Sequence, residues 1–181
     1  MTPDEIKRHL EKLYSYASPR LMDQHELDQV LTHTFSTALK SESQSGGSDK
    51  HDAVWLIGIL RNQIRLHYRE KYRCDDAFTK TRGVVKEILD SPFDLPEQIT
   101  SLSSDVLSQS DQQPFWNAFK ECVEMLDEVH SDVFILRDLE DISVEELSGI
   151  FGLQQSDVIE LVYRARMTVI ACLVRNQELG K

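Results

Sequence analysis

Apolar residues recur along most of this chain at intervals of three and four positions, which places them on one face of a helix. The first such segment begins at Thr2-Pro3-Asp4-Glu5, a capping-box sequence with proline at the first helical position, and continues to about Ala17. A second opens with Asp23 and Glu26 and ends at Ser41. A third covers residues 52–73 and is roughly 33 Å long. No alternating run predicts a strand, so we expect an all-α fold.

The helical pattern weakens between residues 74 and 114. Pro92, Pro96 and Pro114 interrupt this stretch, which is also rich in serine and glutamine. We expect at most a short helix near residues 83–89, in weakly packed backbone of the kind that joins domains. The sequence therefore predicts a domain over residues 1–73, an interdomain linker over 74–114 and a second domain over 115–181.

The second domain reads as four helices, and its third and fourth predict a helix-turn-helix. Ser143 and Glu146 form a capping box, and Gly152 occupies the position that usually ends a helix. The short turn at residues 152–155 gives the two helices the separation of this motif, although other packed helix pairs look similar. The expected helices cover residues 115–126, 131–139, 143–151 and 156–174.

Composition indicates an ordinary folded protein, with 40% hydrophobic and 28% charged residues among 181. The amino terminus has no apolar segment behind a basic start, and no run of about 18 apolar residues occurs, so we expect no signal peptide, no membrane association and a cytoplasmic location. Cys74, Cys122 and Cys172 are far apart and form no CxxC pair, which favours reduced thiols over a disulfide or a zinc site.

The formal net charge of −11 is unevenly distributed. Residues 1–49 carry five basic and eight acidic side chains, residues 50–86 carry nine and four, and residues 87–181 carry six and nineteen. Binding to phosphate draws on a local surplus of lysine and arginine. Only the central segment has such a surplus.

Arg61, Arg65, Arg69 and Arg73 lie four residues apart on the long helix, with Lys71 beside them. Like charges at this spacing repel by a few tenths of a kcal/mol per pair, so an anion or a carboxylate is expected to offset them. Two interpretations stand: the row is solvated or pairs with the chain's own acids, or it binds nucleic-acid phosphates.

Four aromatic residues interleave with this basic row: Trp55, His67, Tyr68 and Tyr72. Aromatic rings beside cations grip unpaired bases in single-stranded nucleic acid. Amphipathic helices also bury aromatic rings routinely, so a core position is the competing interpretation.

Enzymatic motifs are missing from the sequence. It has no Gly-rich phosphate loop, no GxSxG, no HExxH, and no histidines paired at a spacing of four. The acids between residues 138 and 146 surround a helix start, where they favour the helix dipole. We expect no catalytic residue, no metal and no cofactor.

Two segments resemble extracytoplasmic-function sigma factors of the sigma-70 family. Trp55-Leu56-Ile57-Gly58-Ile59-Leu60-Arg61-Asn62, continuing to His67-Tyr68-Arg69, is similar to the helix that opens and reads the upstream half of the promoter bubble. Phe115-Trp116, residues 133–140, residues 143–147 and Tyr163-Arg164-Ala165-Arg166 resemble the second conserved domain. The resemblance implies a three-helix region 2 domain and a four-helix region 4 domain with a helix-turn-helix.

The resemblance also implies a function and partners. A sigma factor is not an enzyme; it binds the RNA polymerase core and directs promoter-specific transcription initiation, and many relatives are held inactive by an anti-sigma factor. The loop of residues 41–51 would take up a base flipped from the minus-ten element. The implied sites are polymerase binding by Gln29, Thr32 and Phe35, DNA binding in the first domain by Trp55, Arg61, Asn62, Arg65, Arg69 and Lys71, and DNA binding in the helix-turn-helix by Gln155, Ser156, Asp157, Ile159, Glu160, Tyr163, Arg164 and Arg166.

The acids on the expected recognition helix support a second hypothesis. Asp157 and Glu160 would face phosphates, although an acid can also accept a hydrogen bond from cytosine N4. The alternative is a sigma-derived regulatory protein whose acidic carboxyl-terminal domain binds a protein partner rather than DNA.

Overall fold

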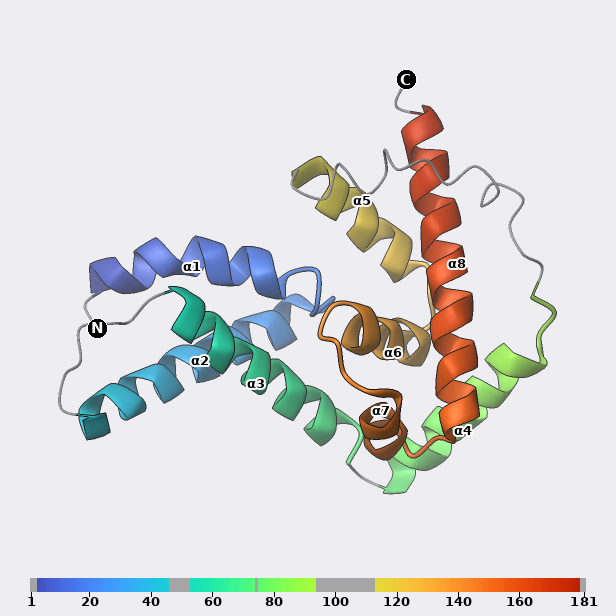
Figure 1. Ribbon diagram of the computed structural model, residues 1–181, viewed down its shortest axis with the longest axis horizontal. Helices are drawn as coiled ribbons and strands as arrows, with labels where there is room; N and C mark the ends of the chain where they lie inside the picture. Colours follow the sequence, from blue (N-terminus) through green and yellow to red (C-terminus); the bar gives the residue numbers. More distant parts are fainter. Residues whose placement is uncertain (1–2, 46–52, 74, 94–112, 180–181) are drawn as a thin grey trace. The chain divides into compact units, whose positions relative to one another are not determined.

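A computed structural model describes residues 3–45, 53–73, 75–93 and 113–179 of the chain (Figure 1). Every regular element within these ranges is an α-helix, which confirms the all-α prediction. The chain divides into two compact units, Met1–Lys71 and Tyr72–Lys181. Each is described here by itself.

The first unit contains α1 (Pro3–Ala17), α2 (Gln24–Ser45) and α3 (Ala53–Lys71). The α2 start follows the expected cap, because Asp23 Oδ1 accepts hydrogen bonds from the backbone N–H groups of His25 and Glu26 at 2.8 and 3.0 Å. The predicted end at Ser41 is wrong. No glycine or proline occurs before Gly46, so nothing in the sequence strongly opposes four further helical residues.

The core of the first unit forms along the apolar row of α3. Leu56, Leu60, Ile64 and Tyr68 are almost completely buried and recur at steps of four. They pack with buried residues of α1 and α2, and α2 runs beside α3 (Figure 1). The Tyr68 hydroxyl donates a 2.7 Å hydrogen bond to the Arg20 carbonyl, which ties the α1–α2 connection to α3.

The second unit is built around its last helix. It contains α4 (Asp75–Asp90), α5 (Gln113–Glu124), α6 (Glu128–Asp138), α7 (Val144–Phe151) and α8 (Gln155–Leu179). Each of the other four helices packs against α8. The central element of this core is α6, in which all residues from Val129 to Leu136 are buried.

The helix α4 lies inside the segment expected to be a linker, and it belongs to the second unit. It is more than twice as long as the short helix expected near residues 83–89. Thr81 and Val85 are buried on its inner face, while Gly83 is exposed with open space around it, so the glycine costs helix propensity without weakening the packing. The sequence signal for this helix is weakened by that glycine, which lowers helix propensity.

A disulfide joins Cys122 of α5 to Cys172 of α8, with their Cα atoms 5.7 Å apart. The expectation of reduced thiols at these two positions is therefore wrong. The two cysteines are separated by 50 residues in sequence, and only the packing of α5 on α8 brings them within bonding reach.

The described part of the chain contains neither a membrane-spanning helix nor a cluster of metal ligands. None of its helices combines the length and the apolar character that crossing a bilayer requires. Nor do three or more histidine, cysteine, aspartate or glutamate side chains within it converge as metal ligands would.

Candidate nucleic-acid interface

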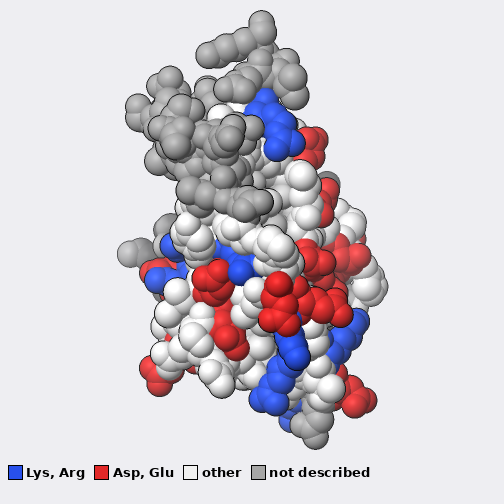
Figure 2. Space-filling model, turned by 90° about the vertical axis from the view of Figure 1, so that its right-hand side faces the viewer, with Lys and Arg blue, Asp and Glu red and all other residues white. Residues whose placement is uncertain are grey.

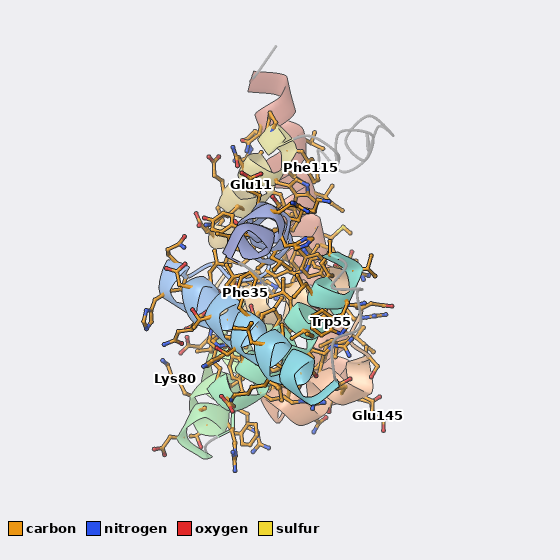
Figure 3. The ribbon with its side chains drawn as sticks, turned by 90° about the vertical axis from the view of Figure 1, so that its left-hand side faces the viewer. Glu11, Phe35, Trp55, Lys80, Phe115 and Glu145 are labelled. Carbon is orange, nitrogen blue, oxygen red and sulfur yellow. A yellow bond between two sulfur atoms is a disulfide. The ribbon has the colours of Figure 1, made fainter. Side chains whose placement is uncertain are left out.

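The predicted DNA-binding residues of the first unit lie along α3, next to its buried apolar row. Arg61 and Arg65 are half-buried, whereas Asn62 and Arg69 are exposed. Trp55 lies half-buried in the first turn of the same helix, as labelled in Figure 3. Because these arginines recur every four residues, they form a basic strip along one side of α3 that is partly accessible to water.

Lys71 is paired with a carboxylate of the same unit. Its Nζ lies 3.7 Å from Glu26 Oε1, and 5.7 Å from the centre of the Tyr68 ring. His67 Nε2 lies 3.4 Å from the other oxygen of Glu26. The contact with His67 is the largest cause that lowers the pKa of Glu26 below its usual value, and Lys71 adds to it. For Lys71, pairing with the chain's own acids is the interpretation that holds.

Two of the aromatic residues expected beside the arginines are core residues. Tyr68 and Tyr72 are 1% and 5% exposed, so their rings cannot stack on bases. Tyr72 belongs to the second unit, where its ring centroid lies 4.4 Å from that of Phe151. The stacking interpretation is wrong for both, because Tyr68 points from α3 into the core of the first unit and Tyr72, directly after α3, is buried in the second unit.

The predicted polymerase-binding residues lie on the outer side of α2. Gln29 and Thr32 are exposed and Phe35 is half-buried, midway along the helix (Figure 3). Gln29 Nε2 lies 2.9 Å from His25 Nε2, and the Thr32 hydroxyl donates to the Asp28 carbonyl at 2.8 Å. These residues form a polar surface with one partly accessible aromatic ring.

The loop expected to capture a flipped base spans residues 41–51. Its residues 41–45 form the last part of α2. Residues 46–51 lie outside the described residues.

The helix-turn-helix of the second unit consists of α7, a short turn and α8. The Ser143 hydroxyl accepts a hydrogen bond from the Glu146 backbone N–H at 3.1 Å, as the capping box predicts. Gly152 ends α7 in the left-handed conformation with φ of 62°. The Ser148 hydroxyl donates to the Leu153 carbonyl at 2.6 Å and holds the turn closed.

The first turns of α8 expose most of the predicted recognition residues. Gln155 and Ser156 are exposed, and Ile159 and Tyr163 retain 58% and 44% of their accessible surface. Asp157 and Glu160 are half-buried. This face therefore offers an apolar and an aromatic side chain flanked by acids.

Arg164 is held inside the second unit and not presented to solvent. Its side chain is 12% exposed, and Nε donates to Glu160 Oε1 at 2.8 Å. Its terminal nitrogens donate to three main-chain carbonyls at the end of α4: those of Ile88 at 2.6 Å, Leu89 at 3.1 Å and Ser91 at 3.0 Å.

Arg166 is also paired. Its guanidinium forms two hydrogen bonds to the carboxylate of Asp138 on α6, the one from Nε at 2.8 Å. This fork is the strongest geometry for such a pair, and it raises the pKa of Arg166 further. Both arginines expected at the DNA backbone thus have acceptors within the unit.

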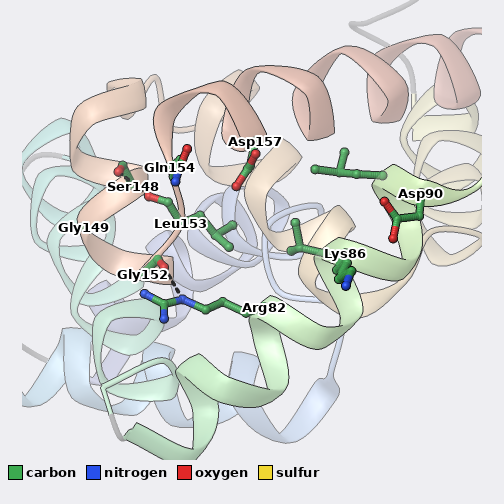
Figure 4. A pocket seen from close by; sticks show the side chains of 11 residues that line it. Arg82, Lys86, Asp90, Ser148, Gly149, Gly152, Leu153, Gln154 and Asp157 are labelled. Carbon is green, nitrogen blue, oxygen red and sulfur yellow. Dashed lines mark hydrogen bonds between the residues drawn. The ribbon is translucent and has the colours of Figure 1, made fainter.

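Sequence reasoning missed the contribution of α4 to this surface. Arg82, Lys86 and Asp90 of α4 line a groove of about 740 Å³ whose other wall includes Gln154 and Asp157 (Figure 4). Arg82 Nε donates to the Gly152 carbonyl at 3.1 Å. Arg82 and Lys86 belong to the basic surplus over residues 50–86. Because residues 74–114 were expected to be a linker, the position of these two cations beside the helix-turn-helix was not predicted.

Charge on the face of the molecule seen in Figure 2 is mixed. Acidic side chains gather in one patch, and basic side chains lie directly beside them. A continuous basic field of the kind that attracts phosphate over a distance is not what this face displays.

Two known proteins are similar in sequence to this chain. The chain is 25% identical over 179 residues to the RNA polymerase sigma factor YlaC of Bacillus subtilis, covering 97% of this chain and 93% of that protein. It is 26% identical over 134 residues to a probable RNA polymerase sigma factor of Haemophilus influenzae, covering 68% of this chain and 64% of that protein. No family model and no solved structure matches the chain.

The described residues combine an all-helical fold with a helix-turn-helix, and the chain is similar to two RNA polymerase sigma factors. These similarities support the resemblance to extracytoplasmic-function sigma factors of the sigma-70 family.

Proposed function

We propose that this protein binds the RNA polymerase core and directs it to specific promoters. The observation that carries the proposal is the match to a sigma factor over 97% of the chain and 93% of the relative, so that the similarity extends over both helical units. The protein would act by binding and not by catalysis. Its partners would be the polymerase core and promoter DNA, with an anti-sigma factor as a regulator in the cell.

The first unit would supply most of the charge-dependent contact with DNA. Arg61, Arg65 and Arg69 lie on the accessible side of α3, with Asn62 and Trp55 nearby. Phosphate contacts by arginine position a protein on nucleic acid and make its affinity depend on salt. Polymerase would be bound by the outer surface of α2, through Gln29, Thr32 and Phe35.

The second unit would read the minus-thirty-five element with the exposed face of α8. Gln155, Ser156, Ile159 and Tyr163 are accessible there. Glutamine can bond adenine in the major groove, and apolar side chains contact the thymine methyl group. Asp157 and Glu160 would accept from cytosine N4. Arg164 and Arg166 would turn to the DNA backbone.

Run-off transcription tests the proposal. Core polymerase of the source organism, supplied with fragmented genomic DNA and this protein, is expected to yield transcripts with defined start sites that core alone does not make. Replacing Arg61 and Arg65 together by alanine is expected to abolish them. The charge-matched control replaces Arg8 and Lys12, exposed on α1, and should retain activity. Absence of defined start sites together with failure to co-purify with core would reject the proposal.

A second candidate is a sigma-derived regulator whose second unit binds a protein. It is favoured by the internal pairing of Arg164 and Arg166, which engages both arginines expected at the DNA backbone with acids of the same unit. Replacing Asp157 and Glu160 by lysine distinguishes the two. Promoter binding should strengthen if α8 reads DNA, whereas capture of polymerase or another protein partner should weaken if the acids form the interface.

A further inference from the structure

The end of α4 lies across the side of the recognition helix and holds its arginine. The carbonyl groups in the last turn of a helix have no partner inside that helix. Here the Arg164 guanidinium supplies donors to the carbonyls of Ile88, Leu89 and Ser91. A cation at this position also interacts favourably with the negative end of the helix dipole.

Phe93 completes this contact from outside the helix. Its ring centroid lies 5.3 Å from Arg164 Cζ, and it meets the Tyr163 ring edge-to-face with centroids 6.2 Å apart. An arginine near an aromatic ring gains a cation–π attraction. Residues 88–93 therefore contact two neighbouring residues of α8, both of them expected at the DNA.

The two ends of α4 are attached differently. Before its last turn, Thr81 and Val85 are buried, and a Cβ added to Gly152 would lie 2.6 Å from the Phe78 ring, so this part packs closely on the helix-turn-helix. At its carboxyl end, Ile88 and Leu89 are only half-buried, and the bonds to Arg164 are polar. Charged donors exchange readily between main-chain carbonyls and phosphate oxygens, whereas a packed apolar face does not.

We propose that residues 88–93 form a strap that withholds Arg164 from DNA in the free protein, and that DNA phosphate must displace the strap for the second unit to bind fully. The strap rests on the proposed function, since it concerns how the same α8 surface reaches DNA. It lowers the affinity of the second unit until phosphate oxygens replace the three carbonyls. The part of α4 before its last turn stays packed throughout.

Salt-dependent binding of a mixed-sequence 30-base-pair duplex to the full chain tests the strap. Each additional phosphate contact steepens the slope of log K against log salt concentration by about 0.9, which is a further three- to fourfold change in affinity between 50 and 200 mM salt. Phe93→Ala weakens the strap, so it is expected to tighten binding while leaving the slope unchanged, because Arg164 reaches phosphate in both bound proteins. Phe115→Ala, which removes another half-buried phenylalanine ring of the second unit, on α5, is the matched control and should leave the affinity unchanged.

Arg164→Ala identifies the group that is released. It should make the slope shallower by about 0.9, because Arg164 contacts phosphate once the strap is displaced, and in its presence Phe93→Ala should no longer tighten binding. An unchanged slope for Arg164→Ala would mean that Arg164 never reaches phosphate, and would overturn the proposal. Unchanged affinity of a folded Phe93→Ala protein, or no duplex binding by any variant, would overturn it too.

Hydrogen exchange in the unaltered chain supplies a test that does not depend on the variant folding. Adding the duplex should speed exchange of the amides in the last turn of α4 while those near Val85 keep their rate. Unchanged or slower exchange at the end of α4 would reject the strap. Run-off transcription tests the sigma function separately. If the protein initiates correctly but shows none of these changes in binding or exchange, the strap proposal is wrong and the proposed function stands.

Discussion

Tyr72 donates a 2.6 Å hydrogen bond to the Asp132 carboxylate inside the second unit. Tyr72 directly follows α3 in the chain, yet its hydroxyl and ring are both buried between α6 and α7. The bond satisfies an acid that is itself only 4% exposed. This pair anchors the start of the second unit.

Tyr72→Phe should therefore destabilise the second unit while keeping its shape. Loss of a hydrogen bond to a buried carboxylate costs about 1–3 kcal/mol. Urea denaturation of the variant should show that decrease in the free energy of unfolding. Tyr14→Phe is the control, because the Tyr14 side chain is exposed and its hydroxyl lies 3.4 Å from Gln24, and it should change stability little.

Reduction of the Cys122–Cys172 disulfide should lower the thermal stability of the second unit. A cross-link between residues 50 apart restricts the unfolded chain, and loop-closure entropy puts its contribution at about 4 kcal/mol. Adding dithiothreitol to the unaltered protein should lower its Tm. A double serine variant should start from the lower Tm and show no response to the reductant; an equal response in both would contradict a structural role.

Gly152→Ala should disrupt the turn of the helix-turn-helix. Its positive φ costs a non-glycine residue about 1–2 kcal/mol, and the added Cβ meets the Phe78 ring at 2.6 Å. Gly149→Ala is the matched comparison within α7, since nothing lies within 4 Å of its added Cβ. That change should stabilise the protein by up to about 1 kcal/mol through helix propensity. Thermal unfolding should give a lower Tm for Gly152→Ala and a higher Tm for Gly149→Ala.

Acid should weaken the first unit through Glu26. The pKa of Glu26 is lowered in the folded state, chiefly by its contact with His67, so the stability that ionised Glu26 contributes is complete above the usual value of 4.5 and is lost as pH falls from there through the lower folded value. For a partly exposed pair the contribution is under about 1 kcal/mol. The free energy of unfolding of Glu26→Gln and of the unaltered chain should be compared between pH 6 and 3. The difference between the two should shrink toward low pH.

Mild acid should weaken the second unit through His130. Burial is the main cause that lowers the pKa of His130, whose Nε2 lies 3.0 Å from the Leu161 carbonyl. The unfolded chain takes up a proton first as pH falls below the usual 6.5, so the stability that neutral His130 contributes is present above that pH and declines beneath it. His130→Gln keeps a donor for the carbonyl. Its free energy of unfolding should decline less between pH 7.5 and 5 than that of the unaltered chain.

The sequence by itself determined the helical class, the capping box at Ser143, the left-handed Gly152 and the buried row of α3. These depend on contacts within a few residues, which spacing and residue type fix directly. The same local rules located the arginines of α3. They also predicted aromatic rings beside them, but the same spacing is compatible with a core position, which Tyr68 adopts.

Only the tertiary structure decided the features that join distant parts of the chain. Cys122 meets Cys172 because α5 packs on α8, and Arg164 meets the carbonyls of residues 88–91 because α4 packs there too. Main-chain carbonyls carry no sequence signature, so no pattern could have shown that they would accept from a predicted DNA-binding arginine. Long-range packing determines which partner each side chain finds, and here it placed Arg164 against α4.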